Sequence, residues 1–321
     1  MEDAPQTYWP ASSSHLPRYA GPVSFFRLPM LAAPEAVDIA LLGLPYDGGT
    51  TNRAGTRHGP RALREASMFI RPYHHVTRRS PYQLARVADL GDAPMNPIDV
   101  AEAMTLITAH YAGVHAAGAV PLTAGGDHLI TLPILRAIAK DGPVGLIQFD
   151  AHSDTNDSYF GGHRYTHGTH VRRGIEEGLI DPKRCIQIGI RGTRYAPDGT
   201  DFAETAGVTT LYIEDVYRLG LAGVIDIARR VVGQGPAYLT FDVDGIDPAF
   251  CPGTGTPEVG GFTLHEAQVM VRGLAGLNLI GADVVEVAPP FDPSGNTALV
   301  GATMMFEILC LLADAVVGRR G

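Results

Sequence analysis

The chain has 321 residues, of which 45% are hydrophobic and 18% charged, a balance that indicates a soluble globular protein with a large core. Its formal net charge of −9 argues against a nucleic-acid partner, because nucleic-acid binding normally needs a basic face. The three cysteines, Cys185, Cys251 and Cys310, are odd in number and far apart, which argues against a disulfide framework and favours a reducing cytoplasm.

The ends of the chain do not indicate a membrane protein. Residues 1–5 lack the basic and apolar regions of a signal peptide. The most apolar late stretch, 304–317, contains Glu307 and Asp314 and is too short to span a bilayer. It is interpreted as a core helix, and no membrane partner is expected.

Residues 1–33 are rich in proline and serine and predict an irregular N-terminal arm over the surface or a neighbouring subunit. Residues 34–321 predict one domain, because strands and helices alternate without a linker or a repeat. Strands are predicted at 37–44, 86–90, 119–123, 144–149, 185–190, 208–213, 237–243 and 279–287. Helices are predicted at 60–67, 97–117, 129–140, 169–178, 222–232, 263–273 and 297–315. This alternation predicts a single three-layer α/β/α domain with a parallel sheet of about eight strands.

Two stretches among these elements indicate function. The glycine-rich loop 45–60 is long for a compact domain, and such loops are more often functional than idle. The apolar run 144–149 ends in Asp150, His152 and Asp154, where binding sites of parallel sheets lie. Three such ligands at alternating positions are costly to desolvate unless a positive charge neutralises them. A divalent metal ion is the simplest candidate.

Two further predicted strand ends carry the same kinds of side chain. Gly125 and Gly126 permit a tight turn that places His128 at the top of the sheet, while Asp242 and Asp244 face one side of an extended segment. The total of four aspartates and two histidines is too large for one ion, but two ions with shared carboxylates could use all six. Mixed carboxylate and imidazole ligands suit Mn²⁺ or a similar first-row ion.

Each cluster also has a structural explanation. His128 alone could cap a helix or pack in the core, Asp150 and Asp154 could cap the next segment, and the third cluster could form a calcium-type loop. Three such clusters at one edge of a sheet make independent structural roles improbable. A binuclear metal site is therefore the stronger hypothesis.

The segments 125–128, 150–154 and 242–248 resemble the three signature motifs of the ureohydrolases, the arginase and agmatinase family. The resemblance runs from about Asp38 to the C-terminus and includes 167–169, 252–257 and 283–287. It implies an arginase-like fold, a catalytic domain at 34–321, and hydrolysis of a guanidino compound to urea and an amine at two Mn²⁺ ions. It also implies a homo-oligomer, either a trimer or a hexamer.

Carried over residue by residue, the resemblance gives two ligand sets that share the bridging residues Asp150 and Asp242. One set is His128, Asp150, Asp154 and Asp242, and the other is His152, Asp150, Asp242 and Asp244. A hydroxide between the ions is the implied nucleophile. Asp247 is expected to orient the ligand loop without touching metal.

His167 and Glu286 complete the implied catalytic set together with Asp154. His167 would carry a proton to the leaving amine, a task suited to a group that titrates near neutrality. Glu286 would hold the cationic guanidinium through charge-assisted hydrogen bonds. Without the resemblance, a strand-end charge and a neighbour of a helix cap are the simpler interpretations of Glu286 and His167.

Some residues depart from the family pattern. Leu129 stands where Ser or Thr is usual, which could alter the groups that support the metal ligands. His163 and His170 flank His167 and could favour another metal such as Ni²⁺, although neither is expected to be a ligand.

The substrate tail is the least specified part. Asn156 and Tyr159 are expected to bind substrate at the pocket mouth, where the ring of Tyr159 would shorten the pocket. A short ω-guanidino acid, guanidinobutyrate or guanidinopropionate, is favoured, with agmatine next. Arg53, Arg57 or a neighbouring subunit could pair with a substrate carboxylate, although ordinary surface or interface pairing is the simpler role for both arginines.

Three alternatives remain beside this prediction. A deacetylase of related fold would use a single zinc ion, and the six-ligand set argues against it. A non-catalytic subunit of a mixed oligomer would not need all six ligands, His167 and Glu286. Free guanidine or a biguanide as substrate is not excluded by the residues.

Overall fold

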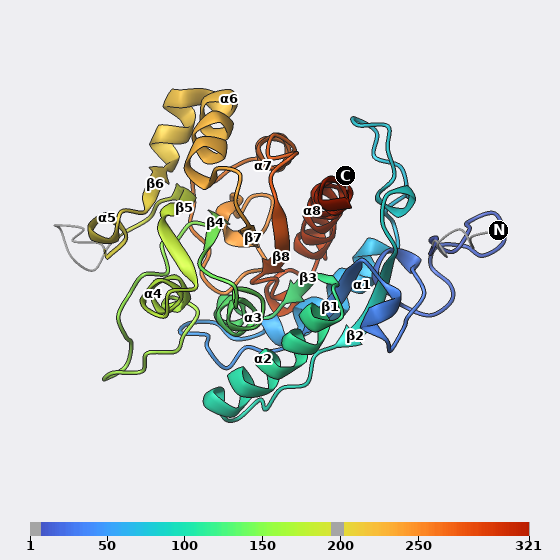
Figure 1. The fold of residues 1–321 in the computed structure, drawn as a ribbon, viewed down its shortest axis with the longest axis horizontal. Helices are drawn as coiled ribbons and strands as arrows, with labels where there is room; N and C mark the ends of the chain where they lie inside the picture. Colours follow the sequence, from blue (N-terminus) through green and yellow to red (C-terminus); the bar gives the residue numbers. More distant parts are fainter. Residues whose placement is uncertain (1–7, 194–201, 321) are drawn as a thin grey trace.

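Eight parallel strands form one sheet in the computed structural model, which describes residues 8–193 and 202–320 (Figure 1). The strands are β1 (Ile39–Leu44), β2 (Val87–Asp92), β3 (Val120–Gly125), β4 (Val144–Phe149), β5 (Ile180–Ile190), β6 (Thr209–Tyr212), β7 (Ala237–Asp242) and β8 (Leu279–Val285). Their order across the sheet is β2-β1-β3-β8-β7-β4-β5-β6, and every neighbouring pair is parallel. The expected parallel sheet of about eight strands is confirmed.

The α-helices of the described residues are α1 (Gly59–Ser67), α2 (Val100–Ala116), α3 (Thr131–Ile138), α4 (His170–Glu176), α5 (Phe202–Ala206), α6 (Ile213–Val232), α7 (Leu264–Arg272) and α8 (Asn296–Arg320). Figure 1 shows α6, α7 and α8 on one side of the sheet and α2, α3 and α4 on the other. The fold is the expected three-layer α/β/α arrangement.

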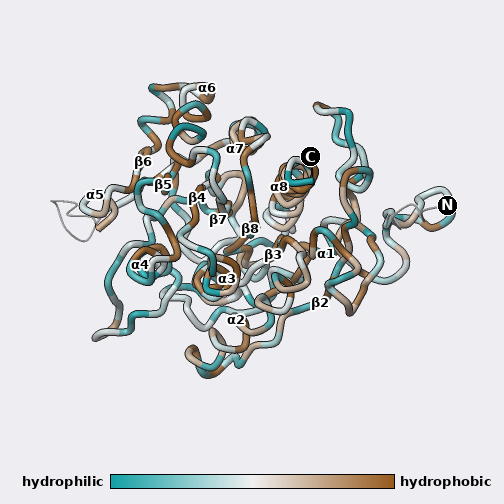
Figure 2. The backbone as a smooth tube through the Cα atoms, viewed as in Figure 1, coloured by the Kyte–Doolittle hydropathy of each residue, from teal (hydrophilic) through white to brown (hydrophobic). Residues whose placement is uncertain are grey.

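Each strand supplies apolar side chains to both sides of the sheet. In β1, Ile39 and Leu41 join the core cluster shared with α1, α6, α7 and α8, whereas Leu42 and Leu44 join the cluster shared with α2, α3 and α4. Alternate residues of a strand point to opposite faces, so strands covered on both sides are apolar throughout. Figure 2 accordingly shows hydrophobic residues concentrated in the strands and the helices beside them.

Several boundaries differ from those predicted. β5 begins at Ile180 instead of residue 185, and α6 begins directly after β6, with Gly220 at φ 70° kinking the helix near the predicted start at 222. The short helix α5 was not predicted, because five residues are too few for a helical period to stand out. The adjoining residues 194–201 lie outside the described residues.

The segment before residue 33 contributes to the core. Phe25 and Phe26 are buried in the cluster beside α1 and α8, and Met30 forms a parallel bridge to Asp89 within β2. The backbone N–H of Phe25 donates to the Asp89 carboxylate at 2.9 Å. Composition alone did not indicate this burial, and the division at residue 33 stays a prediction.

Helix α8 is longer than the apolar stretch that predicted it. Its 25 residues are long and apolar enough to cross a membrane, so the length argument made from 304–317 does not hold for the whole helix. However, 78% of its most apolar window is buried inside the protein, against α1, α7 and β8. This burial supports the interpretation of α8 as a core helix.

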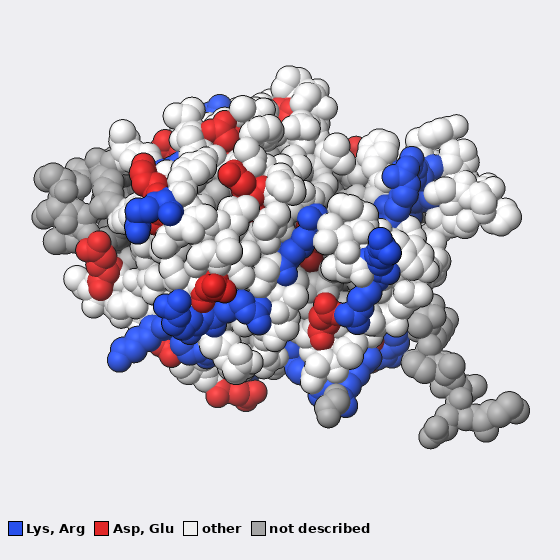
Figure 3. Space-filling view, turned by 90° about the horizontal axis from the view of Figure 1, so that it is seen from above, with Lys and Arg blue, Asp and Glu red and all other residues white. Residues whose placement is uncertain are grey.

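Charged side chains are dispersed over the face of the molecule drawn in Figure 3. Acidic and basic residues lie there among larger uncharged areas. Opposite charges that are interspersed in this way partly cancel one another's field.

Candidate active site

The six predicted metal ligands come from the carboxyl ends of three strands near the middle of the sheet. His128 follows β3 in a short 3₁₀ turn, Asp150 follows β4 directly, and Asp242 is the last residue of β7. In the sheet β7 pairs with β4 on one side and with β8 on the other, and β8 pairs with β3. The ends of these four neighbouring strands therefore meet above one point of the sheet edge.

The turn that carries His128 requires glycine. A Cβ on Gly126 would lie 2.1 Å from the backbone oxygen of Tyr46, closer than any side chain tolerates. The backbone N–H groups of Gly126 and Asp127 donate to the carbonyls of Leu44 and Tyr46 at 3.1 and 2.8 Å. The chain after β3 is thus held directly against the loop after β1.

Three carboxylates surround one nitrogen of His128. Its Nδ1 lies 3.1 Å from Asp150 Oδ2 and 3.2 Å from one oxygen each of Asp154 and Asp242, yet none of them is aligned as a hydrogen-bond acceptor. Donor atoms at right angles around an ion with bonds of about 2.1 Å lie about 3 Å apart, which matches these separations. The residues therefore fit a bound cation.

The other nitrogen of His128 supports this conclusion. The Thr240 hydroxyl donates its single proton to Asp283, so it accepts a hydrogen bond from His128 Nε2 at 2.7 Å. In the neutral imidazole Nδ1 then carries a lone pair that faces three carboxylates. Desolvation opposes a charge on His128, but the three carboxylates raise its pKa well above the ordinary value. A positive charge, either a proton or a metal ion, is needed at this point.

A second group lies beside the first and shares Asp150. His152 Nδ1 lies 3.1 Å from Asp244 Oδ2 and 3.6 Å from Asp150 Oδ1. Asp150 thus presents Oδ2 to the first group and Oδ1 to the second, as a bridging carboxylate does. Asp242 belongs to the first group only, so the bridging role expected of it stays a prediction.

The crowding of these carboxylates changes their pKa values. Burial, together with the charge of Asp150, raises the pKa of Asp154 to about 6. Burial and the charges of Asp244 and Asp150 raise the pKa of Asp242 well above its usual range. Bound cations would offset this repulsion, which is the chemistry that the donor set is suited for.

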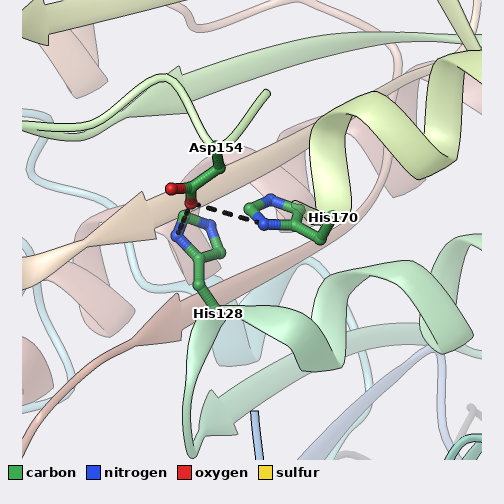
Figure 4. Close-up of side chains that lie close together, drawn as sticks. All are labelled: His128, Asp154 and His170. Carbon is green, nitrogen blue, oxygen red and sulfur yellow. Dashed lines mark ion pairs between the residues drawn. The ribbon is translucent and has the colours of Figure 1, made fainter. Parts of the chain in front are cut away.

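His170 lies closer to the metal groups than expected. Its Nδ1 is 3.3 Å from Asp154 Oδ2, and its ring is centred 4.1 Å from that of His128 (Figure 4). The same Nδ1 donates to the carbonyl of His167 at 3.0 Å, so His170 ties its ring to the loop that carries His167. His163, in contrast, is exposed, and its backbone pairs with that of Tyr159.

His167 and Glu286 form a buried pair. His167 Nδ1 donates to Glu286 Oε1 at 2.9 Å, and its Nε2 lies 2.7 Å from the Thr51 hydroxyl, to which it donates when the ring is protonated. Burial alone would lower the pKa of His167, but the charge of Glu286 raises it to about 9. Glu286 adopts a positive φ of 64°, and its Oε2 is buried without a hydrogen-bond partner within residues 8–193 and 202–320. Strain and an unpaired buried oxygen together are typical of a functional position.

Both ligand groups open into a cavity of about 780 Å³. Asn156 and Tyr159 line it, and the Asn156 side-chain amide donates to the Tyr159 hydroxyl at 2.8 Å. Arg53 and Arg57 do not line it: Arg53 donates to the carbonyls of Thr254 and Gly255, and Arg57 pairs with Asp47. Neither arginine reaches a substrate carboxylate in this cavity, and ordinary structural pairing is their role.

Three contributions were not predicted from the sequence. Thr51 holds Nε2 of His167, Thr240 with Asp283 holds Nε2 of His128, and His170 joins the first ligand group. Only the glycine-rich loop that contains Thr51 had been marked as functional. Leu129 is buried in the core beside Gly49, and Asp247 accepts hydrogen bonds from the backbone of Gly260 and Gly261, in keeping with its expected loop-orienting role.

Comparison with known proteins places this site in a family. The chain matches the sequence model of the arginase family over residues 37–311. It is 58% identical to the guanidinopropionase of Pseudomonas aeruginosa, with 98% of each chain covered, and 45% identical to the guanidinobutyrase of the same organism, with 96% of this chain and 97% of the relative covered. The solved proclavaminate amidinohydrolase of Streptomyces clavuligerus superposes with a TM-score of 0.89 at 41% identity, covering 93% of this chain and 99% of that one. The chain is therefore a member of the arginase family.

Proposed function

We propose that this hydrolase of C–N bonds in linear amidines releases urea from a short ω-guanidino acid, 3-guanidinopropionate or 4-guanidinobutyrate. The observation that carries the proposal is Asp150, which offers one carboxylate oxygen to each of two adjacent His/Asp groups. The names of the relatives, guanidinopropionase and guanidinobutyrase, support the choice of substrate. Agmatine is the second candidate, because an agmatinase is 43% identical over 90% of this chain.

We propose Mn²⁺ as the metal, with Ni²⁺ as the alternative. The first group would use His128, Asp150, Asp154 and Asp242, and the second His152, Asp150 and Asp244. Oxygen and imidazole donors without thiolate suit Mn²⁺. When bound, two divalent cations supply the Lewis acidity that makes water a nucleophile at neutral pH.

The chain's own residues bind and protonate the substrate. Glu286 Oε2, which has no partner among the described residues, is assigned to the guanidinium as a charge-assisted acceptor. His167 lines the cavity and keeps one proton on Nδ1 through Glu286 Oε1. A second proton at Nε2, beside the cavity-lining Thr51, is assigned to the leaving amine. Asn156 and Tyr159 are assigned to the tail of the substrate.

Urea release tests the proposal. The purified chain with added Mn²⁺, and separately with Ni²⁺, is incubated with 3-guanidinopropionate, 4-guanidinobutyrate, agmatine, arginine, guanidine and a biguanide, and its metal content is measured. We expect urea from at least one of the two acids. Urea from guanidine or a biguanide alone would replace the substrate, and a metal-free, inactive chain would support a non-catalytic subunit instead.

We also propose a homo-oligomeric assembly, a trimer or a hexamer, located in the cytoplasm. Phe69, Tyr73 and Val76 are each more than half exposed on one connecting segment, which is unusual for large apolar side chains and suits a subunit interface. The cysteines are free, which suits a reducing compartment. Sedimentation velocity tests the assembly, and cell fractionation tests the location.

A further inference from the structure

A substrate with a carboxylate tail needs a cation on the cavity wall. Among the described residues that line the cavity, only Arg172 and Arg191 are permanently cationic. The guanidinium of Arg191 is fully used by backbone carbonyls, which it contacts at 2.6–3.2 Å: those of Gly189, Asp244, Gly245, Glu258 and Val259. Arg191 therefore holds loops together and has no donor left for a ligand.

Arg172 has a donor left. Its Nε donates to Glu176 Oε1 at 2.9 Å and its Nη2 lies 3.3 Å from Asp157 Oδ1, but no hydrogen bond within the described residues uses Nη1. The guanidinium carbon lies 4.6 Å from the ring centre of Phe202, which stacks against it. The side chain is thus oriented by three neighbours and keeps the NH2 group of Nη1 for another acceptor.

The charges around Arg172 leave a positive excess. Arg164, Arg172 and Arg173 share the carboxylates of Asp157 and Glu176. Asp157 Oδ1 lies closest to the buried Arg173, at 3.0 Å, and Arg173 also pairs with Glu176. The hydrogen bond from Arg173 is the main reason why the pKa of Asp157 is lowered. Within this cluster of described residues, three guanidinium groups face two carboxylates, which gives the cluster one net positive charge.

Arg172 lies on an element that also carries a residue of the metal groups. It follows His170 by two residues on α4, and its backbone N–H is directed at the carbonyl of Asp154 at 3.5 Å. Its side chain lines the same cavity as Asp154 and His167. The wall of one cavity therefore carries both the acidic metal groups and a cation, which matches a molecule with a guanidinium at one end and a carboxylate at the other.

We propose that Arg172 binds the carboxylate of an ω-guanidino acid through Nη1 and so determines the preference of the enzyme for acids over agmatine. The proposal rests on the proposed function, since it assigns the tail of that substrate. It replaces Arg53 and Arg57 as the carboxylate partner. Agmatine, whose tail is cationic, would meet a like charge at the same place.

Substitution of Arg172 tests the proposal against a matched control. Arg164 pairs with the same two carboxylates but does not line the cavity, so R164Q removes an equivalent charge from the same cluster. We expect R172Q to raise KM for 3-guanidinopropionate and to lower the preference for it over agmatine by about 10- to 100-fold, the range for a hydrogen bond to a charged group. R164Q should leave this preference within about twofold, and R172K should fall between R172Q and the unsubstituted protein.

Two results would overturn the assignment. If R172Q lowers the activity on 3-guanidinopropionate and on agmatine by the same factor, Arg172 supports the fold of the site and does not bind the substrate carboxylate. The same conclusion follows if R164Q and R172Q change the preference for 3-guanidinopropionate over agmatine equally. The Kd of 3-guanidinopropionate for the Mn²⁺-loaded protein, measured by calorimetry, tests the role of Arg172 separately from the proposed function. If 3-guanidinopropionate binds without release of urea, and binds more weakly to R172Q, only the proposed function is contradicted. If the two proteins have equal Kd values, or if neither binds the compound, the role of Arg172 is contradicted.

Discussion

Asp242 shows how a metal site destabilises a protein that lacks its metal. Its carboxylate is buried beside Asp150 and Asp244, and burial together with these charges raises its pKa well above the ordinary value. One of its oxygens accepts a hydrogen bond from the backbone of Asp244, so the local backbone depends on an acceptor there and not on a charge. Stability and metal binding therefore make opposite demands on this residue.

We expect Asp242→Asn to stabilise the metal-free protein and to destabilise the metal-loaded one. Asn keeps the acceptor for Asp244 but removes one charge from the cluster. The melting temperature after chelation should rise by about 2–4 °C for each 1 kcal/mol gained, while the increase caused by Mn²⁺ should shrink because a ligand is lost. A variant that melts below the unsubstituted protein in both states would contradict the repulsion argument.

Glu286 is held by one oxygen and free at the other. Oε1 accepts from the backbone of His128 and from His167, while Oε2 has no hydrogen-bond partner in the described part of the chain. Glu286→Gln can keep the Oε1 contacts but removes the charge. We therefore expect kcat/KM to fall by about 30- to several-thousand-fold, which corresponds to a loss of about 2–5 kcal/mol in transition-state stabilisation. Metal content and melting temperature should change little. Loss of metal together with activity would show instead that Glu286 supports the metal ligands.

At the scale of elements, the loops after β1 and β3 hold each other. Gly126 lies against the carbonyls of Leu44 and Tyr46, and His167 donates its backbone N–H to Gly49 in the same loop. The loop 45–60 therefore supports both a metal ligand and the proton-transfer residue. Its length is explained by these contacts.

We expect Gly126→Ala to cost about 1–3 kcal/mol or more in unfolding free energy, because the new methyl group overlaps backbone that cannot move away. It should also lower the metal content, since His128 follows two residues later. Gly113→Ala in α2 is the control, because a Cβ there meets no atom within 4 Å and removes backbone freedom from the unfolded chain. Chemical denaturation of both variants measures the difference. Equal stability of the two variants would contradict the steric argument.

At the scale of the whole molecule, Asp38 joins three segments that are distant in sequence. It accepts hydrogen bonds from the backbone and side chain of Arg86 before β2 and pairs with Arg320 at the end of α8. Burial would raise the pKa of Asp38, but the hydrogen bonds from Arg86 and the pairing with Arg320 lower it to about 2. The carboxylate therefore ties the C-terminal helix to the start of β1.

Because the folded pKa of Asp38 is depressed, its contribution to stability is present above pH 4 and is lost as the pH falls from about 4 to about 2. We expect Asp38→Asn to lower the unfolding free energy by about 1–2 kcal/mol at pH 7, a value discounted for the exposure of both arginines. The difference between variant and unsubstituted protein should shrink toward pH 2. Urea unfolding across this range measures it, with the exposed Asp141→Asn as control. A difference that does not depend on pH would contradict the ion-pair explanation.

The eight strands and the chemistry of the site could be predicted from the sequence alone. Apolar runs predicted the eight strands, and the Asp and His residues just after three of them predicted a metal centre, because both patterns are local. Only the tertiary structure shows that the strands lie in the order β3-β8-β7-β4. It also shows that Asp150 belongs to two ligand groups and that His170 lies in one of them. The same holds for the arginines: Arg53 and Arg57 are spent on structural contacts, and Arg172 reaches the cavity. The physical reason is that side-chain partners depend on which strands and helices become neighbours, and packing between segments far apart in the chain decides that.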